Sequence, residues 1–425
     1  MRVYIENYGC PLNKADGHYM LSLLVKEGYE VVKEPEKASI IIVNTCTVRK
    51  ETENKMVKRI SELRKIALKN KAKLVVAGCM PKAQPYLIVR YAPEASMVSP
   101  QNYNKILEIA KSSKRMIFLS GERRTDIVPM LVEKVIAAIP IAEGCVGKCS
   151  YCIVRLARGK LRSYPPRLII GRIKEAVSKG VVEIDLTAQD TAAYGLDLGI
   201  RLPDLLDKVV EVEGDFMVRV GMMNPNLAYE ILDELIEAYK HPKIFKFLHI
   251  PLQSGDNRVL KIMNRPYTIE EFKEIVYEFR RKIPDINVTT DIIVGHPGED
   301  EEAFENTLKV IKELKFDRIH IAAYSLRPHT LSASMKQIPS YVKKQRLKRI
   351  IELMEKVTFE KHNKYVGRTV KALTTEEGRD LTVIARTINY YPIVINDSNI
   401  KLGSWVQVKI IKNTFYDLRG IIVNY

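Results

Sequence analysis

The chain has 425 residues, of which 46% are hydrophobic and 28% are charged, enough for about two or three ordinary domains with hydrophobic cores. No apolar run approaches the roughly 20 residues that span a bilayer, and the N-terminal residues lack the layout of a secretory signal peptide. We therefore expect a globular, cytoplasmic protein with no membrane partner. Because disulfides are rare in a reducing compartment, the six cysteines point to metal ligation or catalysis.

The net charge of +17 is unevenly distributed along the chain. Residues 1–128 hold 23 basic against 13 acidic side chains (+10), residues 129–360 hold 35 against 33 (+2), and residues 361–425 hold 10 against 5 (+5). Basic surfaces at both ends would attract a polyanion such as RNA through its phosphates. A lysine-rich solvated surface, as in many heat-stable proteins, explains the same numbers equally well.

Residues 1–112 alternate between strand and helix patterns and predict a doubly wound, parallel α/β domain. The expected strands and helices are Val3–Tyr8, Ala15–Glu27, Ser39–Asn44, Glu51–Ala67 and Leu74–Ala77. Cys10, Cys46 and Cys79 each come just after one of the strands. Because the carboxyl ends of parallel strands meet at one edge of a sheet, we expect these cysteines to converge there. The alternative is three unrelated buried cysteines.

The βα alternation resumes on a larger scale in residues 131–360. Six strands separated by amphipathic helices predict a partial (βα)6 barrel with its site at the carboxyl ends of the strands. The expected strands are Ala137–Ile141, Glu183–Thr187, Phe216–Val220, Phe247–Ile250, Asn287–Val294 and Arg318–Tyr324. Short β-rich runs broken by turn residues follow in residues 361–425 and predict a small antiparallel β-barrel.

The strongest chemical signal is the segment EGCVGKCSYC, which holds Cys145, Cys149 and Cys152. Its spacing places three thiolates on one tight loop, where they match three corners of a cubane iron–sulfur cluster and leave the fourth iron without a protein ligand. Such an iron is open to a small molecule. Structural zinc sites generally use four ligands in paired knuckles, and the sequence has no second pair of this kind.

The motif CxxxCxxC with Tyr151 before its last cysteine resembles that of the radical S-adenosylmethionine (SAM) superfamily. The resemblance implies that SAM chelates the open iron and that its reductive cleavage gives a 5′-deoxyadenosyl radical, which abstracts hydrogen from a C–H bond. The segments LTAQDTAAYG, HIPLQSG, MNRPYT and DIIVGHPGE resemble the strand-end motifs that hold SAM in that superfamily. The SAM-binding positions implied in this way are Tyr151, Gln189, Gln253, Ser254, Asp291 and Gly295.

A longer series of segments resembles the methylthiotransferase family in the same order over nearly the whole chain. The segments are GCPLNKAD, NTCTVRKETENK, AGCMP, EGCVGKCSYC, RGKLRSYP, LTAQDTAAYG, LHIPLQSG, DIIVGHPGE and YSLRP. The resemblance implies an N-terminal cluster domain (1–112), a radical SAM core (131–360) and a TRAM-type RNA-binding domain (361–425). It departs from the family pattern at GHPGED, where the family usually has GFPGET, and at RPHTLSA, where it usually has RPGTPA.

The same resemblance implies two 4Fe–4S clusters with separate tasks. The cluster on Cys145, Cys149 and Cys152 generates the radical, and a second cluster on Cys10, Cys46 and Cys79 presents the sulfur. One SAM methylates that sulfur, and another activates the substrate carbon. A low-potential electron donor of the ferredoxin or flavodoxin type and a sulfur donor are then needed as partners. Arg158, Arg162 and Ser163 match a family segment near the active site and are candidates for contacting substrate or phosphate, although a solvated basic loop explains them nearly as well.

Members of the family modify an adenosine beside the tRNA anticodon or an aspartate of a small-subunit ribosomal protein. The basic ends favour RNA, and the segments RVGMMNP and LTAQDTAAYG resemble the archaeal and eukaryotic branch that acts on threonylcarbamoyladenosine. We therefore expect a methylthio group to be added to carbon 2 of threonylcarbamoyladenosine in tRNA. The alternatives are isopentenyladenosine in tRNA and the ribosomal protein, which LTAQDTAAYG also resembles.

Overall fold

The computed structural model describes residues 1–121, 125–397 and 399–424, so Ser398 and Tyr425 of the predicted C-terminal domain lie outside it. The chain forms two compact units. Unit 1 comprises Met1–Leu131, Ala138–Leu168 and Ser325–Ala333, and unit 2 comprises Val132–Ala137, Ile169–Tyr324 and Ser334–Tyr425. The three-domain division expected from the sequence stays a prediction.

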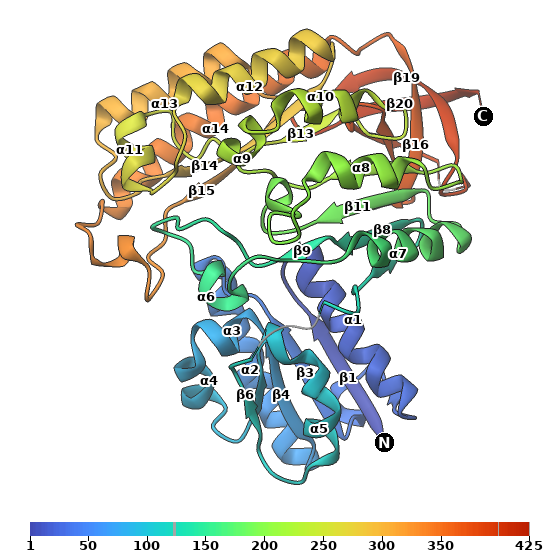
Figure 1. The fold of residues 1–425 in the computed structure, drawn as a ribbon, viewed down its shortest axis with the longest axis vertical. Coiled ribbons are helices and arrows are strands. Elements are labelled where there is room, and N and C mark those ends of the chain that lie inside the picture. Colours follow the sequence, from blue (N-terminus) through green and yellow to red (C-terminus); the bar gives the residue numbers. More distant parts are fainter. Residues whose placement is uncertain (122–124, 398, 425) are drawn as a thin grey trace. The chain divides into compact units, whose positions relative to one another are not determined.

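Unit 1 is built on a six-stranded sheet in the order β2-β1-β3-β4-β5-β6, in which every neighbouring pair is parallel (Figure 1). The strands are β1 (Arg2–Asn7), β2 (Glu30–Val31), β3 (Ile40–Thr45), β4 (Lys73–Gly78), β5 (Ser96–Val98) and β6 (Ile117–Phe118). All six residues of β3 are buried, as the apolar run Ile40–Val43 predicts for a central parallel strand, and the polar Asn44 and Thr45 at its end are buried too.

Helices cover both faces of this sheet, which confirms the predicted doubly wound arrangement. One face packs on α1 (Pro11–Lys26), η2 (Pro100–Lys105) and α5 (Ile106–Lys111), and the other on α2 (Lys50–Asn70), α3 (Cys79–Ala83) and α4 (Pro85–Tyr91). The short η1 (Pro35–Lys37) precedes β3. In α2 the buried residues recur at helical spacing as Met56, Ile60, Leu63 and Ala67, so one stripe of the helix faces the sheet.

The later segments of unit 1 contain a two-stranded antiparallel sheet and a short helix. These elements are β9 (Ala142–Glu143), β10 (Arg162–Ser163) and α6 (Val154–Arg158). The 3-10 helix η4 (Leu331–Ser334) starts in this unit, and both the N–H and the Oγ of Ser332 donate to the Ser150 carbonyl at 2.9 and 3.0 Å.

The larger part of unit 2 contains the strands expected for a partial (βα)6 barrel. Two sheets form, with orders β12-β11-β8-β7 and β13-β14-β15. The strands are β7 (Leu131–Glu133), β8 (Ile136–Pro140), β11 (Glu183–Thr187), β12 (Met217–Val220), β13 (Phe247–His249), β14 (Asn287–Val294) and β15 (Arg318–Ala323), of which residues 132–137 of β7 and β8 belong to unit 2. All six predicted strands are present, as β8, β11, β12, β13, β14 and β15, and their bounds differ from the predicted ones by at most one residue.

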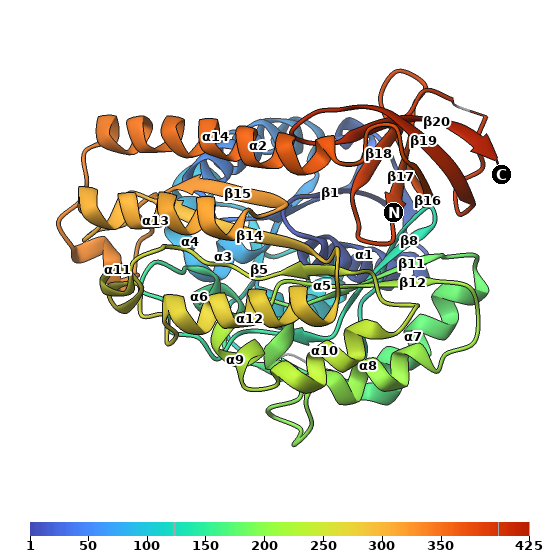
Figure 2. The same ribbon diagram turned by 90° about the horizontal axis from the view of Figure 1, so that it is seen from above.

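Helices alternate with these strands along the chain, as the amphipathic patterns predict. They are α7 (Pro166–Ser178), η3 (Thr191–Ala193), α8 (Leu202–Val210), α9 (Pro225–Tyr229), α10 (Leu232–Lys240), α11 (Asn257–Ile262), α12 (Ile269–Lys282), α13 (Glu301–Leu314) and α14 (Ser340–Asn363). Helix α14 packs on β15 and α13 and reaches the C-terminal barrel at β19 (Figure 2).

The C-terminal part of unit 2 is a closed barrel in the order β16-β17-β18-β20-β19. Its strands are β16 (Thr369–Glu377), β17 (Val383–Thr387), β18 (Pro392–Ile395), β19 (Trp405–Asn413) and β20 (Leu418–Asn424). The expectation of a purely antiparallel barrel is wrong at one pair, because β18 and β20 run parallel. Five strands are an odd number, so antiparallel pairing cannot alternate all the way round a closed barrel.

Gly78 ends β4 in a left-handed conformation with φ 95°, and a Cβ placed there would lie 2.4 Å from the Thr45 carbonyl oxygen. Gly28 also has a left-handed φ (83°) but has no neighbour within 4 Å of such a Cβ. Both alanine variants incur the left-handed cost of about 1 kcal/mol, and only Gly78→Ala adds a backbone clash. We expect Gly78→Ala to lower the melting temperature, followed by circular dichroism, clearly more than Gly28→Ala does. Equal shifts would contradict this account.

Candidate functional site

Unit 1 brings Cys10, Cys46 and Cys79 together at the carboxyl edge of its sheet. They follow β1, β3 and β4, which are adjacent strands, and Cys79 is also the first residue of α3. The approach is close: a Cβ at Gly9, beside Cys10, would lie 2.9 Å from the Cβ of Cys46. The backbone at Gly9 has φ 95°, a conformation that favours glycine. Sheet topology thus gathers three thiols that are far apart in sequence.

Burial sets the chemistry of these thiols. It raises the pKa of Cys46, and it raises the pKa of Cys79 to about 12, although the Arg158 guanidinium acts in the opposite direction. The thiols of Cys46 and Cys10 lie near enough to raise the pKa of Cys79 further. Such thiols stay protonated unless a metal ion stabilises the thiolates. Three sulfur ligands at one edge fit an iron–sulfur cluster with one iron open.

The second set, Cys145, Cys149 and Cys152, lies on the loop between β9 and α6, also in unit 1. The loop curls tightly: the N–H of Gly147 donates to the Cys145 sulfur at 3.2 Å, and a Cβ at Gly147 would lie 3.3 and 3.8 Å from the sulfurs of Cys145 and Cys149. All three side chains are partly exposed. They too fit a cluster with an accessible iron.

The two sets of cysteines are joined through packing within unit 1. Ile153, the residue after Cys152, and Ala157 of α6 form one buried cluster with Cys79 and Ala83 of α3. The helix that follows one set therefore rests on the helix that begins with a member of the other.

Arg158, at the end of α6, adds polar contacts to this apolar packing. Its side chain is 1% exposed, and its Nη1 lies 2.5 Å from both Asp16 Oδ2 and Glu143 Oε1. Its Nη2 donates to Asn13 Oδ1 at 2.7 Å, and Asn13 Nδ2 in turn donates to the Tyr8 carbonyl at 2.6 Å. The structure thus gives Arg158 a different role from the predicted substrate contact, because its guanidinium is enclosed by protein groups.

Arg327 forms a similar connection that sequence reasoning missed. Its Nη2 donates to the carbonyl and the hydroxyl of Thr47 at 2.8 and 2.9 Å and pairs with the buried carboxylate of Glu53. Its Nε and Nη1 are buried without a hydrogen-bond partner in the part of the chain that the structure describes. Thr47 follows Cys46 directly, so Arg327 fixes the backbone beside a cysteine. Its place in the segment YSLRP was the available signal.

Of the other two candidates after the cysteine loop, Arg162 and Ser163 form β10, which pairs with β9 at Glu143 and Ala142. Ser163 is buried and Arg162 is half-buried. The pairing of β9 with β10 joins the two ends of the segment that contains the cysteine loop. Tyr151, the aromatic residue of the motif, is also half-buried.

In unit 2, Gln253, Ser254 and Gly295 lie beyond the carboxyl ends of adjacent strands. The segment after β13 pairs with β14 through the N–H of Gln253, which donates to the Asp291 carbonyl at 2.8 Å, and the backbone at Gln253 has φ 62°. The Oε1 of Gln253 is buried and has no hydrogen-bond partner in the described residues. An unsatisfied buried amide oxygen at a strand end fits a ligand that carries N–H or O–H donors, as SAM does. Gln189, also predicted for SAM, lies two residues after β11.

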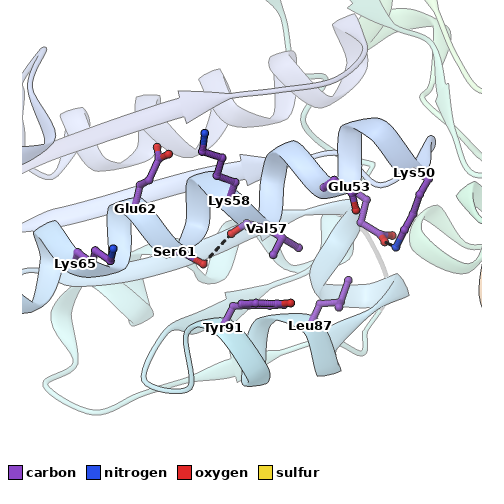
Figure 3. A pocket seen from close by; sticks show the side chains of 10 residues that line it. Lys50, Glu53, Val57, Lys58, Ser61, Glu62, Lys65, Leu87 and Tyr91 are labelled. Carbon is purple, nitrogen blue, oxygen red and sulfur yellow. Dashed lines mark hydrogen bonds and ion pairs between the residues drawn. The ribbon is translucent and has the colours of Figure 1, made fainter.

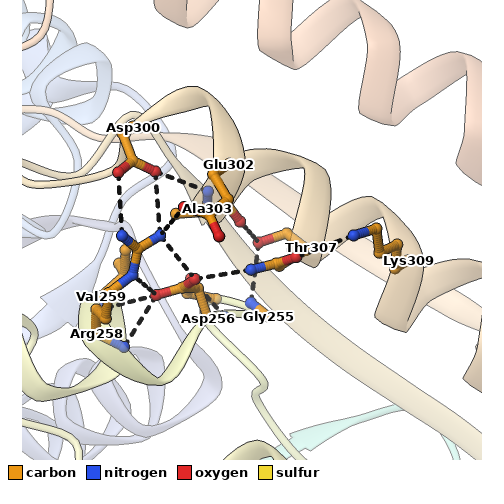
Figure 4. A network of polar contacts seen from close by, with 11 residues as sticks. Gly255, Asp256, Arg258, Val259, Asp300, Glu302, Ala303, Thr307 and Lys309 are labelled. Atoms are coloured by element: carbon orange, nitrogen blue, oxygen red, sulfur yellow. Dashed lines mark hydrogen bonds and ion pairs between the residues drawn. The ribbon is translucent and has the colours of Figure 1, made fainter.

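A network of charged residues fixes the loop that carries Gln253 and Ser254 (Figure 4). Asp256 caps α11 by accepting from the N–H groups of Arg258 and Val259 at 2.9 and 3.2 Å. Its other oxygen accepts from Asn306 Nδ2 of α13 at 2.9 Å. Gly255 N–H donates to Thr307 Oγ1 of the same helix at 2.9 Å. The loop is therefore anchored to α13 through both Gly255 and Asp256.

Asp291, predicted to bind SAM, lies inside β14 and not beyond its end. Both of its oxygens are engaged: His249 Nε2 lies 2.8 Å from Oδ2, and His320 Nδ1 lies 3.1 Å from Oδ1. Burial opposes ionisation, but the hydrogen bonds from the two histidines lower the pKa of Asp291 below its usual range. His296 is fully buried, with its ring edge-on to Tyr324, and burial lowers its pKa to about 4, so it is neutral at physiological pH.

A hollow of about 500 Å³ lies on the outer side of α2, between this helix and α4 (Figure 3). Lys50, Lys58 and Lys65 line it together with Glu53 and Glu62. Because both signs of charge are present and no cysteine lines it, the hollow does not extend the cysteine site.

Arg158 offers a direct test of how unit 1 holds its cysteines. Arg158→Met leaves Asp16 and Glu143 buried without their cation, a loss that costs about 3–5 kcal/mol in buried ion pairs. We expect a large fall in melting temperature. The control Arg64→Met breaks the exposed ion pair with Glu94 (37% and 39% exposed) and should change little. Similar melting temperatures for the two variants would refute the role given to Arg158.

Three family models match successive parts of the chain. Residues 2–99 match the model described as uncharacterized protein family UPF0004, residues 139–311 match the radical SAM superfamily, and residues 363–423 match the TRAM domain. The radical SAM match implies SAM and iron–sulfur chemistry. In the described residues no helix is long and apolar enough to cross a membrane.

Solved structures resemble the chain in fold alone. The radical S-adenosylmethionine methyltransferase TsrM from Kitasatospora setae superposes with a TM-score of 0.59 at 16% identity, covering 78% of this chain and 77% of that one. The cobalamin-dependent S-adenosylmethionine radical enzyme OxsB gives a TM-score of 0.54 at 12% identity, covering 84% of this chain and 56% of that one.

Curated relatives match over nearly the full length. The proteins of Pyrococcus horikoshii and Methanocaldococcus jannaschii, each named probable threonylcarbamoyladenosine tRNA methylthiotransferase, are 44% and 43% identical, covering 93% and 100% of this chain and 93% and 97% of their own lengths. The Homo sapiens protein, named threonylcarbamoyladenosine tRNA methylthiotransferase, is 34% identical over 99% of this chain and 73% of its own length. The chain therefore belongs to the radical SAM methylthiotransferase family, in the branch whose archaeal and animal members are named threonylcarbamoyladenosine tRNA methylthiotransferases.

Proposed function

We propose that the chain transfers a methylthio group to carbon 2 of threonylcarbamoyladenosine next to the anticodon of tRNA. The observation that carries this proposal is the presence of two separate cysteine triplets in one compact unit. Relatives at 34–44% identity that share one substrate name support the choice of substrate over isopentenyladenosine and over the ribosomal protein. The match to a TRAM domain supports RNA as the partner.

In this proposal each triplet holds one 4Fe–4S cluster, and bound SAM supplies both the methyl group and the radical. The residues of the chain then position these groups. Arg158 and Arg327 fix the loops and strand ends that carry the cysteines. Gln253, Ser254 and Gly295 are proposed to bind SAM, and Gln189 and Tyr151 are proposed beside them. A low-potential electron donor of the ferredoxin or flavodoxin type and a sulfur donor complete the proposed set of partners.

The cluster count is testable by iron analysis after anaerobic reconstitution. We expect about eight irons per chain. Replacing Cys145, Cys149 and Cys152 with alanine should remove about half of the iron and abolish SAM cleavage. Replacing Cys10, Cys46 and Cys79 should also remove about half but leave SAM cleavage in place. A chain that takes up zinc and little iron would overturn the proposal of two clusters.

The substrate is tested by mass spectrometry of nucleosides from tRNA incubated with the reconstituted chain, SAM, a reductant and sulfide. We expect methylthio-threonylcarbamoyladenosine to appear only when the tRNA carries the threonylcarbamoyl group. The triple alanine variant of Cys10, Cys46 and Cys79 should give none, because it lacks the proposed sulfur-presenting cluster. A methylthio group on isopentenyladenosine, or on the ribosomal protein with tRNA unchanged, would refute the assignment.

A further inference from the structure

Unit 2 contains a cavity of about 300 Å³ that the cysteine and SAM residues do not line. Strands β13, β14 and β15 form one side through residues such as His249 and His320, and the C-terminal β-barrel forms the other through Arg386 and Tyr390. Phe415 and Tyr416, in the turn between β19 and β20, also line it. We call this cavity the basic chamber.

The strand register explains how these side chains share one face. Arg318 of β15 lies opposite Thr289 of β14, and His320 lies opposite Asp291 two residues further on. Residues two apart on a strand point to the same side, so Arg318 and His320 face the same side of the sheet, and both line the chamber.

Three arginines line the chamber, and two of them have carboxylate partners. Arg219 binds Asp185 with two hydrogen bonds of 2.7 Å, and Arg386 lies 2.5 Å from Glu376. Arg318 is an exposed residue, and its side chain forms no hydrogen bond or ion pair in the part of the chain that the structure describes. Although the residue as a whole is exposed, the groups packed around its guanidinium remove part of its hydration, and this desolvation together with the nearby charge of Arg386 lowers the pKa of Arg318.

Two acids close to Arg318 in sequence or in strand pairing, Asp317 and Asp291, are already engaged. Asp317, its neighbour in sequence, accepts from Lys361 Nζ at 2.6 Å and from the Val288 N–H at 2.9 Å, and also bonds Tyr391. Asp291 is held between His249 and His320. The guanidinium of Arg318 therefore has no carboxylate partner among the described residues.

His249, Asp291 and His320 are also a possible metal-binding group, since their donor atoms lie within 4.8 Å of one another. Two observations argue against a cation. Both carboxylate oxygens of Asp291 are taken by the histidines, and the guanidinium of Arg318, which has no carboxylate partner in the described residues, lines the same cavity and repels positive charge. The chamber is suited to an anion.

The aromatic residues indicate what carries the anion. Tyr390 is contacted by the guanidinium groups of Arg219 and Arg386, 5.4 and 4.8 Å from its ring centre. Phe415 and Tyr416 lie with their ring centres 4.0 Å apart, and Tyr416 is 58% exposed. Of these rings only Tyr416 is exposed, and nucleic-acid bases stack on exposed aromatic rings, with arginine contributing cation–π contacts.

We propose that the basic chamber binds an oxyanion of the tRNA substrate. Arg318 is the residue that pairs with the oxyanion, and Arg386 and Tyr416 lie beside it. This inference rests on the proposed function, because it takes tRNA as the substrate. The oxyanion has two sources on that RNA: the carboxylate of the threonylcarbamoyl group and a backbone phosphate. Both pair with a guanidinium through charge-assisted hydrogen bonds.

The test measures binding by the reconstituted full chain of two anticodon stem-loop RNAs, with and without the threonylcarbamoyl group, by fluorescence anisotropy at several salt concentrations. Arg318→Gln removes the charge, and because Arg318 has no partner in the described residues, the variant should fold normally. Arg318→Lys keeps the charge and should retain most of the affinity. Arg281→Gln is the matched control, because Arg281 is 65% exposed on α12 and does not line the chamber.

We expect Arg318→Gln to weaken RNA binding by about tenfold, and Arg281→Gln to leave it near that of the unchanged chain. A loss confined to the threonylcarbamoyl RNA identifies the carboxylate as the ligand. An equal loss on both RNAs, with the salt slope reduced by about 0.9, identifies a phosphate. If Arg318→Gln binds both RNAs as tightly as the unchanged chain at every salt concentration, the proposal is overturned.

The outcome is separable from that of the proposed function. A chain that binds RNA through Arg318 and yet forms no methylthio nucleoside would refute the function and leave the chamber standing. A chain that forms the methylthio nucleoside, and whose Arg318→Gln variant binds both RNAs with unchanged affinity, would do the reverse.

Discussion

The ion pairs of Arg158 are the constraint on which the arrangement of cysteines in unit 1 depends. One guanidinium, almost completely removed from water, contacts Asp16 of α1 and Glu143 of β9. A buried charge is tolerated only when its partners are in place, since an uncompensated one costs several kcal/mol. The N-terminal helix and the strand that leads into the cysteine loop must therefore stay together for unit 1 to be stable. Arg327 adds the same requirement for the segment 325–333 through Thr47 and Glu53.

This constraint explains why unit 1 collects three separate pieces of the sequence. Apolar packing between Cys79 and Ile153 brings the two cysteine sets into one core, but apolar contacts are not directional. Hydrogen bonds to charged groups are directional, so the arginines specify which loop lies against which strand end. A reaction that needs a sulfur-presenting centre and a radical-generating centre requires this kind of fixed placement.

Local pattern in the sequence was sufficient for the longer strands and helices and for the placement of three cysteines at strand ends, but not for the short strands β2, β5 and β6. The apolar run of β3 predicts a buried strand. The helical spacing of Met56, Ile60 and Leu63 predicts an amphipathic helix. Pairs between distant residues could not be predicted in this way: Arg158 and Asp16 are separated by 142 residues, and no local pattern distinguishes a buried arginine from one that faces solvent. The mixed pairing of the C-terminal barrel depended on the number of strands in the closed ring, which is a property of the whole domain.

The same difference applies to the charged residues: the sequence gives their number, but only the structure shows which of them are paired. The sequence establishes that residues 361–425 carry a net positive charge, which is compatible with RNA or with an ordinary solvated surface. The structure shows which individual charges are balanced: Arg386 of this segment has Glu376, whereas in residues 129–360 Arg219 has Asp185 and the acids beside Arg318 are engaged elsewhere. A count of charges cannot distinguish a balanced arginine from an unbalanced one. An arginine without a counter-ion beside the exposed Tyr416 is more specific evidence than a net basic charge, because it indicates which chemical group the partner must contribute.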